Sequence, residues 1–366
     1  MNQPIPLVDL RAQQAEIAAE LAPDLERIFS TAAFVGGPDV AAFERDYAEF
    51  TGVRHCVGVA NGTDGIELAL RAVGVGPGDE VILPANTFIA TAEAVARTGA
   101  TCVLVDVAPD SLLIDPSLVA VAVTTRTKAI LPVHLFGQVA PIEKVEAAVS
   151  GMDVVIIEDA AQSQGAIRHG VVSGALGRLA STSFYPGKNL GAAGDAGAVT
   201  TDDDDLAQKV RLLGNHGSAL KYVHDSLGFN SRLDTIQSVV LRHKLGRLPK
   251  WNDLRRQAAT RYTELLAGVD GVILPTELAG NEHVWHLYVV RVQRRDAVLT
   301  SLNANGIGAG IHYPVPVHLT GAFSGLGYAS GRFPASVPRQ RSCRCRCSPT
   351  SPPGSRSGSL LACGKP

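Results

Sequence analysis

Five short apolar runs alternate with helical segments between about residues 40 and 215, and this alternation constrains the fold most. The runs are rich in β-branched residues and are bounded by Gly, Pro or Asp: "HCVGVA", "EVILPA", "TCVLVDV", "KAILPV" and "DVVIIED". Segments such as "TDGIELALRAVG" and "FIATAEAVARTG" have helical character. Strands that are apolar on both faces and separated by helices predict an α/β fold, a mostly parallel central sheet flanked by helices.

The chain beyond this region predicts a smaller α+β C-terminal domain. A long helical stretch, "LDTIQSVVLRHKLGRLPKWNDLRRQAATRYTELLAG", is expected to break or kink at Pro249. It is followed by a strand in "HVWHLYVVRV", a helix around "RDAVLTSLNANG" and the strand-like "GIGAGIHYP". We therefore expect four parts: an N-terminal segment (1–35), a large domain (36–245), a small domain (246–332) and a disordered tail (333–366). The N-terminal segment is expected to pack on the small domain or on a partner chain.

Composition excludes several classes of function. Charged residues are 19% of the 366, hydrophobic residues are 46%, and the net charge is -2, which argues against nucleic acid or a membrane surface as the main partner. The start has acids and no apolar core of a signal peptide, and no apolar run reaches the length of a membrane span. Cys56 and Cys102 lie in apolar runs and are expected to be buried thiols, a usage typical of a cytoplasmic protein.

Polar residues at the ends of the predicted strands are the candidates for a site, because parallel sheets bind ligands at the carboxyl ends of their strands. In "VANGTDG", Gly62, Thr63 and Asp64 would present backbone N–H groups at a helix N-terminus, which is a phosphate site. An ordinary Thr-Asp helix cap is the alternative. Phe88, in "LPANTFIAT", would stack on a flat ring or serve only in packing.

The run "VVIIEDAAQS" ends in the strongest acidic candidate. Asp159 ends an apolar strand, where an unpaired carboxylate is costly, so we expect a cationic partner. Glu158 would point to the other side of the strand and serve a structural role. Gln162 lies close enough in sequence to contact the same ligand as Asp159.

Ser183 and Lys188, in "SFYPGKNLGAAGDAG", complete a set that suits pyridoxal phosphate (PLP). The cofactor's aldehyde needs an amine, its pyridine nitrogen needs a carboxylate, and its phosphate needs N–H and O–H donors. A dinucleotide site fits less well, because no G-x-G-x-x-G follows the first strand.

These segments resemble the DegT/DnrJ/StrS group of sugar aminotransferases, which are PLP enzymes of fold type I. The resemblance covers about residues 4–332 and is most specific in "EDAAQSQGA", "SFYPGKNLGA", "GDAGAV", "GNHGS" and "FNSRLDTIQ". It implies that Lys188 holds the cofactor covalently, that Asp159 pairs with the pyridinium, and that Phe88 and Gln162 lie at the ring. It further implies a phosphate cup of Gly62, Thr63 and Ser183, and a homodimer in which Asn230 reaches the phosphate of the neighbouring subunit.

The resemblance also implies an activity. Relatives with His in place of the lysine are dehydratases, so Lys188 favours transamination. "FYPGKNLGA" together with "HLFGQ" is similar to enzymes of 3-keto nucleotide sugars. The expected reaction moves the amino group of glutamate to a dTDP-3-keto-6-deoxyhexose, for antibiotic or surface-glycan biosynthesis. The alternatives are a 4-keto sugar aminotransferase, a PLP sugar dehydratase and a non-catalytic regulatory relative.

Five further residues are weaker candidates for substrate contact. Tyr313 and His318, in "HYPVPVHL", match a family segment near the substrate, although a rigid turn explains the same residues. Lys221, Tyr222 and Arg232 would contact the sugar nucleotide's phosphates across the dimer interface; a solvated face or an ion pair is the alternative. His134 ends a strand near the site, where a hydrogen-bonded structural histidine is the alternative.

The tail departs from the family pattern. Its "SCRCRCSP" has the spacing C-x-C-x-C rather than the paired C-x-x-C of zinc sites, so no metal is expected. In a frame shifted by one base, a GC-rich coding of these residues reads Leu-Ser-Leu-Pro-Leu-Phe-Pro, which is what the resemblance leads one to expect here. We therefore hypothesise a frameshift shortly upstream, near residues 334–341.

Overall fold

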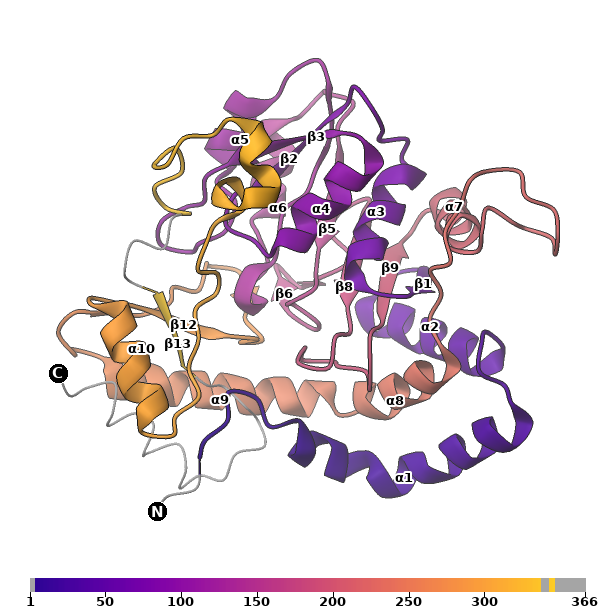
Figure 1. Ribbon diagram of the computed structural model, residues 1–366, viewed down its shortest axis with the longest axis horizontal. Helices are drawn as coiled ribbons and strands as arrows, with labels where there is room; N and C mark the ends of the chain where they lie inside the picture. Colours follow the sequence, from indigo (N-terminus) through magenta and orange to yellow (C-terminus); the bar gives the residue numbers. More distant parts are fainter. Residues whose placement is uncertain (1–3, 337–341, 346–366) are drawn as a thin grey trace.

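A seven-stranded sheet forms the centre of the computed structural model, which describes residues 4–336 and 342–345 (Figure 1). The strand order is β1-β9-β8-β5-β4-β2-β3. All neighbours are parallel except β9, which is antiparallel to both β1 and β8. The strands are β1 (His55–Val59), β2 (Glu80–Pro84), β3 (Thr101–Val105), β4 (Thr127–Ile130), β5 (Val155–Asp159), β8 (Leu179–Ser183) and β9 (Gly197–Thr201).

The mostly parallel α/β sheet predicted from the sequence is confirmed, and each of the five apolar runs forms a strand. The alternation of side chains along β2 shows why it is apolar throughout. Val81 and Leu83 belong to the apolar cluster on one face, and Ile82 belongs to the cluster on the other. Both faces are therefore covered, as a parallel sheet requires.

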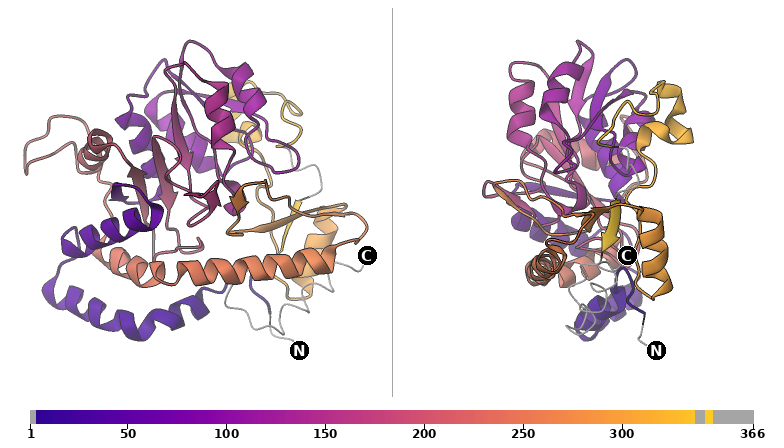
Figure 2. Two further views of the ribbon diagram at one scale, coloured as in Figure 1. Left: turned by 180° about the vertical axis from the view of Figure 1, so that it is seen from behind. Right: turned by 90° about the vertical axis from the view of Figure 1, so that its left-hand side faces the viewer.

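Helices cover both faces of this sheet (Figure 2). The side chains of α3, α4 and α7 pack in the first cluster, and those of α5 and α6 pack in the second. These helices are α3 (Gly62–Ala72), α4 (Ile89–Thr98), α5 (Pro116–Ala122), α6 (Ile142–Ala148) and α7 (Asp204–Gly214). Short elements at the rim are η1 (Leu135–Gly137), η2 (Val317–Leu319), η3 (Gly321–Leu326) and a small sheet of β11 (Asn281–Glu282), β6 (Ile167–Arg168) and β7 (Val171–Val172).

The N-terminal segment packs on the same chain. Helix α1 (Leu10–Thr31) lies along α8 (Thr235–Leu245) (Figure 1), and Ile17, Leu21 and Ile28 share an apolar cluster with Val239 and Val240. Helix α2 (Pro38–Thr51) packs between α8 and the edge of the sheet. Before α1, Ile5 forms a parallel bridge with Ile307, so the start of the chain also reaches the C-terminal part.

The C-terminal part is a second, smaller α+β unit. Helix α9 (Leu248–Leu266) starts with Pro249 in its first turn, where no intrahelical N–H bond is lost, so the predicted break falls between α8 and α9. Helix α10 (Arg295–Ala304) and the sheet β10 (Val272–Ile273), β12 (Tyr288–Val292) and β13 (Ser342–Cys345) complete it. The strand expected in "GIGAGIHYP" does not form as such, because Ile307 pairs only through the isolated bridge with Ile5.

Part of the predicted disordered tail is ordered. Ser342–Cys345 forms β13, which pairs antiparallel with β12 and so satisfies the backbone groups of that strand. Phe333 and Ser336 are buried, and Ser336 donates from its N–H (2.7 Å) and its Oγ (2.6 Å) to Asp106. The prediction of disorder was wrong at these positions. The strand is held by backbone hydrogen bonds and Ser336 by the Asp106 carboxylate, and neither contact requires a hydrophobic pattern in the tail. The remaining residues of the tail lie outside the described part of the chain.

None of the helices in the described ranges is both long and apolar enough to cross a membrane. Cys56 and Cys102 are buried, as predicted. Burial raises the pKa of the Cys102 thiol to about 12.

Candidate active site

Four chain segments that follow strands meet at one edge of the sheet. Strand β1 is antiparallel to β9 and β9 is antiparallel to β8, so β1 runs in the same direction as β8, β5 and β2. The residues after these strands therefore lie at a common carboxyl edge. This edge holds Asn61–Asp64, Phe88, Asp159 and Ser183.

The turn from β1 to α3 lies close against the ends of β8 and β9. A Cβ atom on Gly62 would lie 2.6 Å from the Cβ of Ser183, and one on Gly197 would lie 2.5 Å from the carbonyl carbon of Asn61. These contacts are too close for any side chain, so both positions require glycine. As a result, the first N–H groups of α3 and the Ser183 side chain lie side by side.

The capping residue of α3 is Asn61 and not the Thr-Asp pair considered from the sequence. Asn61 accepts a hydrogen bond from the N–H of Asp64 at 2.9 Å. The carboxylate of Asp64 pairs with Arg97 at 3.2 Å. Gly62 and Thr63 thus occupy the first turn of the helix, where the N–H groups favour an anion.

Asp159 is held by the hydroxyl of Thr91 and by a backbone N–H, and sequence reasoning missed both Thr91 and its partner Thr87. Its Oδ2 accepts from Thr91 Oγ1 at 2.7 Å, and its Oδ1 accepts from the N–H of Ala161 at 3.2 Å. Since the Thr91 proton points at Asp159, Thr87 Oγ1 must donate the 2.8 Å bond to Thr91. The carboxylate is 6% exposed, and these donors fix its orientation. The sequence feature that could have identified them is the segment "NTFIAT", whose two threonines are four residues apart, the spacing of residues that face the same side of a helix.

Gln162 joins two residues that are far apart in sequence. Its Oε1 accepts from the N–H of Phe136 at 2.7 Å, and its Nε2 donates to Tyr313 Oη at 2.9 Å. The ring of Tyr313 lies 5.5 Å from that of Phe88, with 37° between the planes. The structure therefore brings Tyr313 together with Gln162 and Phe88, and half of the Phe88 surface remains exposed.

Lys188 lies in a tight turn between β8 and β9. The base of the turn is closed by a 2.8 Å bond from the N–H of Ala192 to the carbonyl of Phe184. Within it, the N–H of Lys188 donates to the carbonyl of Tyr185 at 2.8 Å. A Cβ on Gly191 would lie 2.3 Å from the carbonyl oxygen of Pro186, so the small residues near Lys188 let the chain fold closely on itself.

The residue after Lys188 anchors this turn to the C-terminal unit. Asn189 is buried, and its Nδ2 donates to Asn252 Oδ1 (3.0 Å) and to the carbonyl of Val284 (3.0 Å). Its Oδ1 lies 3.1 Å from Nδ1 of His286, which is therefore the donor. Sequence reasoning missed Asn189, since nothing in "GKNLG" shows what would face it.

Four predicted residues lie in the segment between α7 and α8, part of which projects from the body (Figure 1). Asn230, Lys221, Tyr222 and Arg232 are all exposed. Lys221 Nζ lies 5.0 Å from the ring of Tyr222. Arg232 Nη1 donates to Asn215 Oδ1 at 3.2 Å, and Asn230 forms an isolated backbone bridge with Asn215. Within one chain, these contacts do not connect them to the strand-end residues.

His318 is buried. Its ring packs edge-on against Phe333 at 4.8 Å. Burial lowers the pKa of His318, and the nearby Asp106 carboxylate opposes this only in part. Its backbone neighbour Val317 donates to the carbonyl of Ala85 at 3.1 Å. These contacts favour the structural alternative for this residue.

His134 and Glu158 form a fully buried pair on the other side of β5. Nδ1 of His134 accepts from the N–H of Ala140 at 3.0 Å, so the proton lies on Nε2, which donates to Glu158 at 2.7 Å. Glu158 also accepts from the N–H groups of Gly174 and Gly177. Burial by itself raises the pKa of Glu158, but these hydrogen bonds together hold it below its ordinary value.

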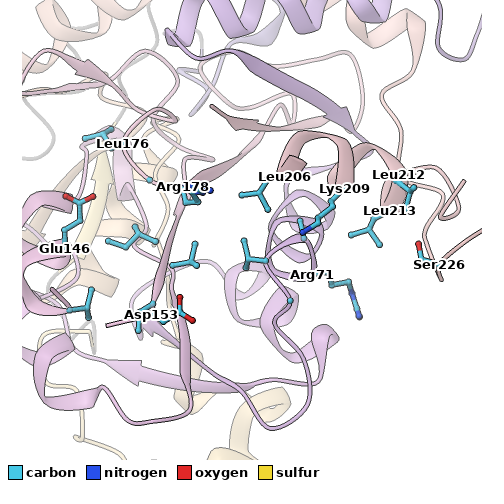
Figure 3. A pocket seen from close by; sticks show the side chains of 18 residues that line it. Arg71, Glu146, Asp153, Leu176, Arg178, Leu206, Lys209, Leu212, Leu213 and Ser226 are labelled. Carbon is cyan, nitrogen blue, oxygen red and sulfur yellow. The ribbon is translucent and has the colours of Figure 1, made fainter. Parts of the chain in front are cut away.

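A broad cavity of about 1070 Å³ opens elsewhere (Figure 3). Its lining includes Val155 and Arg178, which stand at the start of β5 and just before β8, together with Arg71 and Lys209. It therefore lies at the amino edge of the sheet, opposite Asp159 and Ser183. The volume of a cavity therefore does not identify the strand-end site, which is formed by backbone groups and turns at the opposite edge of the sheet.

The strand-end residues fit pyridoxal phosphate. The Gly62–Ser183 contact and the Gly197–Asn61 contact leave a backbone cradle with N–H and hydroxyl groups for a phosphate. Asp159 offers a buried, oriented carboxylate for a pyridinium, and Phe88 offers an exposed ring face. A lysine follows Ser183 by five residues in the same loop.

Comparisons with known proteins agree with this chemistry. The model of the DegT/DnrJ/EryC1/StrS aminotransferase family matches residues 15–350. The chain is 44% identical over 330 residues to a dTDP-3-amino-3,4,6-trideoxy-alpha-D-glucose transaminase of Streptomyces venezuelae (90% of this chain, 87% of the relative). It is 47% identical over 317 residues to a UDP-N-acetyl-3-dehydro-alpha-D-glucosamine 3-aminotransferase of Acidithiobacillus ferrooxidans (87% and 86%).

A solved structure has the same fold. The crystal structure of S. venezuelae DesV in complex with a ketimine intermediate superimposes with a TM-score of 0.96 at 41% identity, covering 99% of this chain and 98% of that one. The fold is therefore that of a fold type I PLP aminotransferase.

Replacing Gly62 by Ala should weaken PLP binding by about 10- to 100-fold, because the new Cβ would displace Ser183 from the first turn of α3. Titration of the apoprotein with PLP measures this affinity. Gly76→Ala is the matched control, since nothing lies within 4 Å of a Cβ built there. Equal affinities in Gly62→Ala and the parent would contradict the phosphate cup.

Replacing Glu158 by Gln should destabilise the protein by about 3–5 kcal/mol near neutral pH, because an amide nitrogen would face buried donors. The lowered pKa of Glu158 means that its stabilisation is present above the ordinary value of 4.5 and is lost as pH falls through the folded-state pKa. Urea unfolding across this pH range should show the difference between parent and variant shrinking in acid. A difference independent of pH would argue against an ionised Glu158.

Proposed function

Because this chain belongs to the DegT/DnrJ/EryC1/StrS aminotransferase family and is a PLP-dependent sugar aminotransferase, we propose a specific reaction for it. It transfers the amino group of glutamate to C3 of a dTDP-linked 3-keto-6-deoxyhexose. The product is a dTDP-3-amino sugar for antibiotic or surface-glycan biosynthesis. The names of both curated relatives place the amino group at C3, which supports the position, although they differ in the nucleotide.

The observation that carries this proposal is the meeting of four strand ends at one edge. The first turn of α3, Ser183 and the oriented Asp159 carboxylate occupy that edge, and Lys188 follows Ser183 in the next turn. Each has a role that the others do not duplicate. Gly62, Thr63 and Ser183 hold a phosphate, Asp159 holds a proton at the ring nitrogen, and Lys188 supplies the amine.

The bound cofactor supplies an electron sink that stabilises negative charge at the carbon losing its proton. The protein supplies the proton transfers. The amine of Lys188 takes the proton from Cα of the amino donor and returns a proton to the C3 carbon of the sugar. To act as a base the amine must be neutral.

The side chains at the ring orient rather than react. Gln162 is fixed at both ends, by Phe136 and by Tyr313, so its amide cannot rotate freely. Phe88 would cover one face of the cofactor ring, and the ring of Tyr313 packs against Phe88. Tyr313 therefore belongs to the pocket that receives the sugar, whereas buried His318 packs against Phe333.

The exposed segment after α7 suits a homodimer with shared sites. Leu220, Tyr222 and Leu227 expose 70%, 83% and 97% of their surface, which is costly for apolar side chains unless another surface covers them. In a dimer, Asn230 would reach the cofactor phosphate of the second subunit, and Lys221 and Arg232 would meet the phosphates of the nucleotide sugar.

Three other functions are the alternatives to this proposal. A 4-keto aminotransferase would use the same residues and differ only in how the sugar is oriented. A dehydratase is disfavoured because Lys188 is present. A regulatory relative without catalysis would have no need to keep Asp159 oriented by Thr91 or Ser183 beside α3.

Glutamate should convert the PLP-loaded protein to its amino form, with loss of the visible absorbance of the lysine–cofactor link. In Lys188→Ala this absorbance should be missing from the start, because no other amine lies in the turn. Spectral titration with glutamate measures both, and aspartate serves as the control donor. If the parent binds PLP but does not react with glutamate, the assignment of glutamate as amino donor is wrong. If the Lys188→Ala spectrum equals that of the parent, the assignment of Lys188 as the PLP-binding residue is wrong.

The sugar is tested separately by the position of the new amine. The amino form is mixed with 3-keto and 4-keto dTDP-hexoses and with a UDP-linked 3-keto sugar, and the products are examined by NMR. We expect amination at C3 with preference for the dTDP sugar. Amination at C4, or loss of water without amination, would replace the proposal by the corresponding alternative.

A further inference from the structure

A buried lysine on α8 has no part in the chemistry described above. Lys244 is 5% exposed, and its Nζ donates to the carbonyl oxygen of Gly191 at 2.7 Å. The residues flanking both partners belong to one apolar cluster: Leu241, Leu245, Leu190 and Ala192. The ammonium group is therefore buried where α8 packs against the turn.

This position costs stability. Burial lowers the pKa of Lys244 to about 8, and no carboxylate in the described part of the chain offsets the effect. The neighbouring charges on α8 have partners of their own: Arg242 binds Asp46 at 2.7 Å and His243 lies 2.9 Å from Asp24. A buried cation with one carbonyl partner is typical of a group kept for function rather than for stability.

The carbonyl that Lys244 binds belongs to the turn that carries Lys188, three residues earlier in the chain. The same helix holds this segment a second time. Gln237 Oε1 accepts from the N–H of Ala193 at 2.8 Å. Gln237 and Lys244 are seven residues apart and so lie on one face of α8. The turn is thus held on this side by two bonds from a single rigid helix.

We propose that Lys244 is a positioning residue: through the Gly191 carbonyl, its ammonium group holds the turn in the orientation that Lys188 needs to bind the cofactor and to move a proton. This inference rests on the proposed role of Lys188. On the opposite side, Asn189 anchors the same turn to the C-terminal unit, so the two contacts together leave the turn little freedom.

The proposal predicts two pH dependences of opposite sign, one for the positioning of Lys188 and one for the stability of the protein. The bond to Gly191 is strongest while Lys244 is charged, so positioning should weaken as pH rises through about 8. Stability should change the other way, because between about pH 8 and 10.5 the folded state binds fewer protons than the unfolded state. A buried lysine that served only packing would show the stability effect without the positioning effect, because the stability effect follows from the lowered pKa alone.

Other titratable groups on the packed elements must be separated from Lys244. They are Tyr47 and Asp46 on α2, Asp24 and Glu20 on α1, Arg242 and His243 on α8, and Lys188 and Tyr185 in the turn itself. Burial raises the pKa of Tyr47 far above this range. Lys188 is present in both variant and parent. Dividing the variant's trapping rate or kcat by the parent's at each pH therefore removes the contribution of Lys188 titration.

The experiment compares Lys244→Met, which keeps the apolar stem, with Lys244→Arg, which keeps charge and donors. Arg242→Met is the matched control, because it removes a cation from the same helix at a side chain that is 39% exposed and paired with Asp46. Each apoprotein is mixed with PLP and reduced with borohydride, and the modified lysine is identified and quantified by peptide mass spectrometry. Melting temperatures of the apoproteins are measured between about pH 7 and pH 10.

We expect Lys244→Met to slow trapping at Lys188 by about tenfold and to lower kcat similarly, with KM within about twofold of the parent. The deficit should shrink as pH rises above about 8, where the parent loses its own charge. Lys244→Arg should recover most of the rate, and Arg242→Met should match the parent. The melting temperature of Lys244→Met relative to the parent should fall from about pH 8 to pH 10.

Parent-like trapping and kcat in folded Lys244→Met would overturn the proposal. If that variant does not fold, Lys244→Gln keeps a donor without charge; a trapping ratio to the parent that rises with pH supports the inference, and a constant ratio near one overturns it. If the parent itself is trapped at another lysine, the role of Lys188 fails instead, so the two failures are distinguishable.

Discussion

The buried carboxylate of Glu158 is the contact on which the rest of the site depends. It accepts hydrogen bonds from His134, which follows β4, and from the backbone of Gly174 and Gly177, which precede β8. The loops on both sides of β5 are therefore tied to one residue of that strand. Because successive side chains point to opposite faces, fixing Glu158 also fixes Asp159 toward the site.

The turn that carries Lys188 is held from outside the sheet. Asn189 binds the C-terminal unit and Gly191 binds Lys244 on α8, so a movement of either partner would shift the amine between them. In the proposed function the amine of Lys188 both binds the cofactor and moves a proton, and such a side chain tolerates little displacement. In the role proposed for Lys244, the stability lost by burying its charge is exchanged for the orientation of this turn.

Much of the fold followed from the sequence. The five apolar runs were predicted because parallel strands are buried on both faces and leave a local pattern. Strands β8 and β9 were not among them. Their sequences, "LASTS" and "GAVTT", combine small, apolar and hydroxyl residues, and these residues are buried only because neighbouring elements cover them. The strand expected in the segment containing Ile307 also failed, because its partner Ile5 offers a single bridge and not a ladder.

The sequence by itself determined the chemical set: a lysine, an acid at a strand end, a serine and a glycine-rich helix start, each recognisable because local pattern places it after a strand. Only the tertiary structure decided what orients them. Thr91 reaches Asp159, Tyr313 reaches Gln162 and Lys244 reaches the turn of Lys188 across 68, 151 and 53 residues of chain. Such hydrogen bonds depend on how helices and loops pack, which no local periodicity encodes.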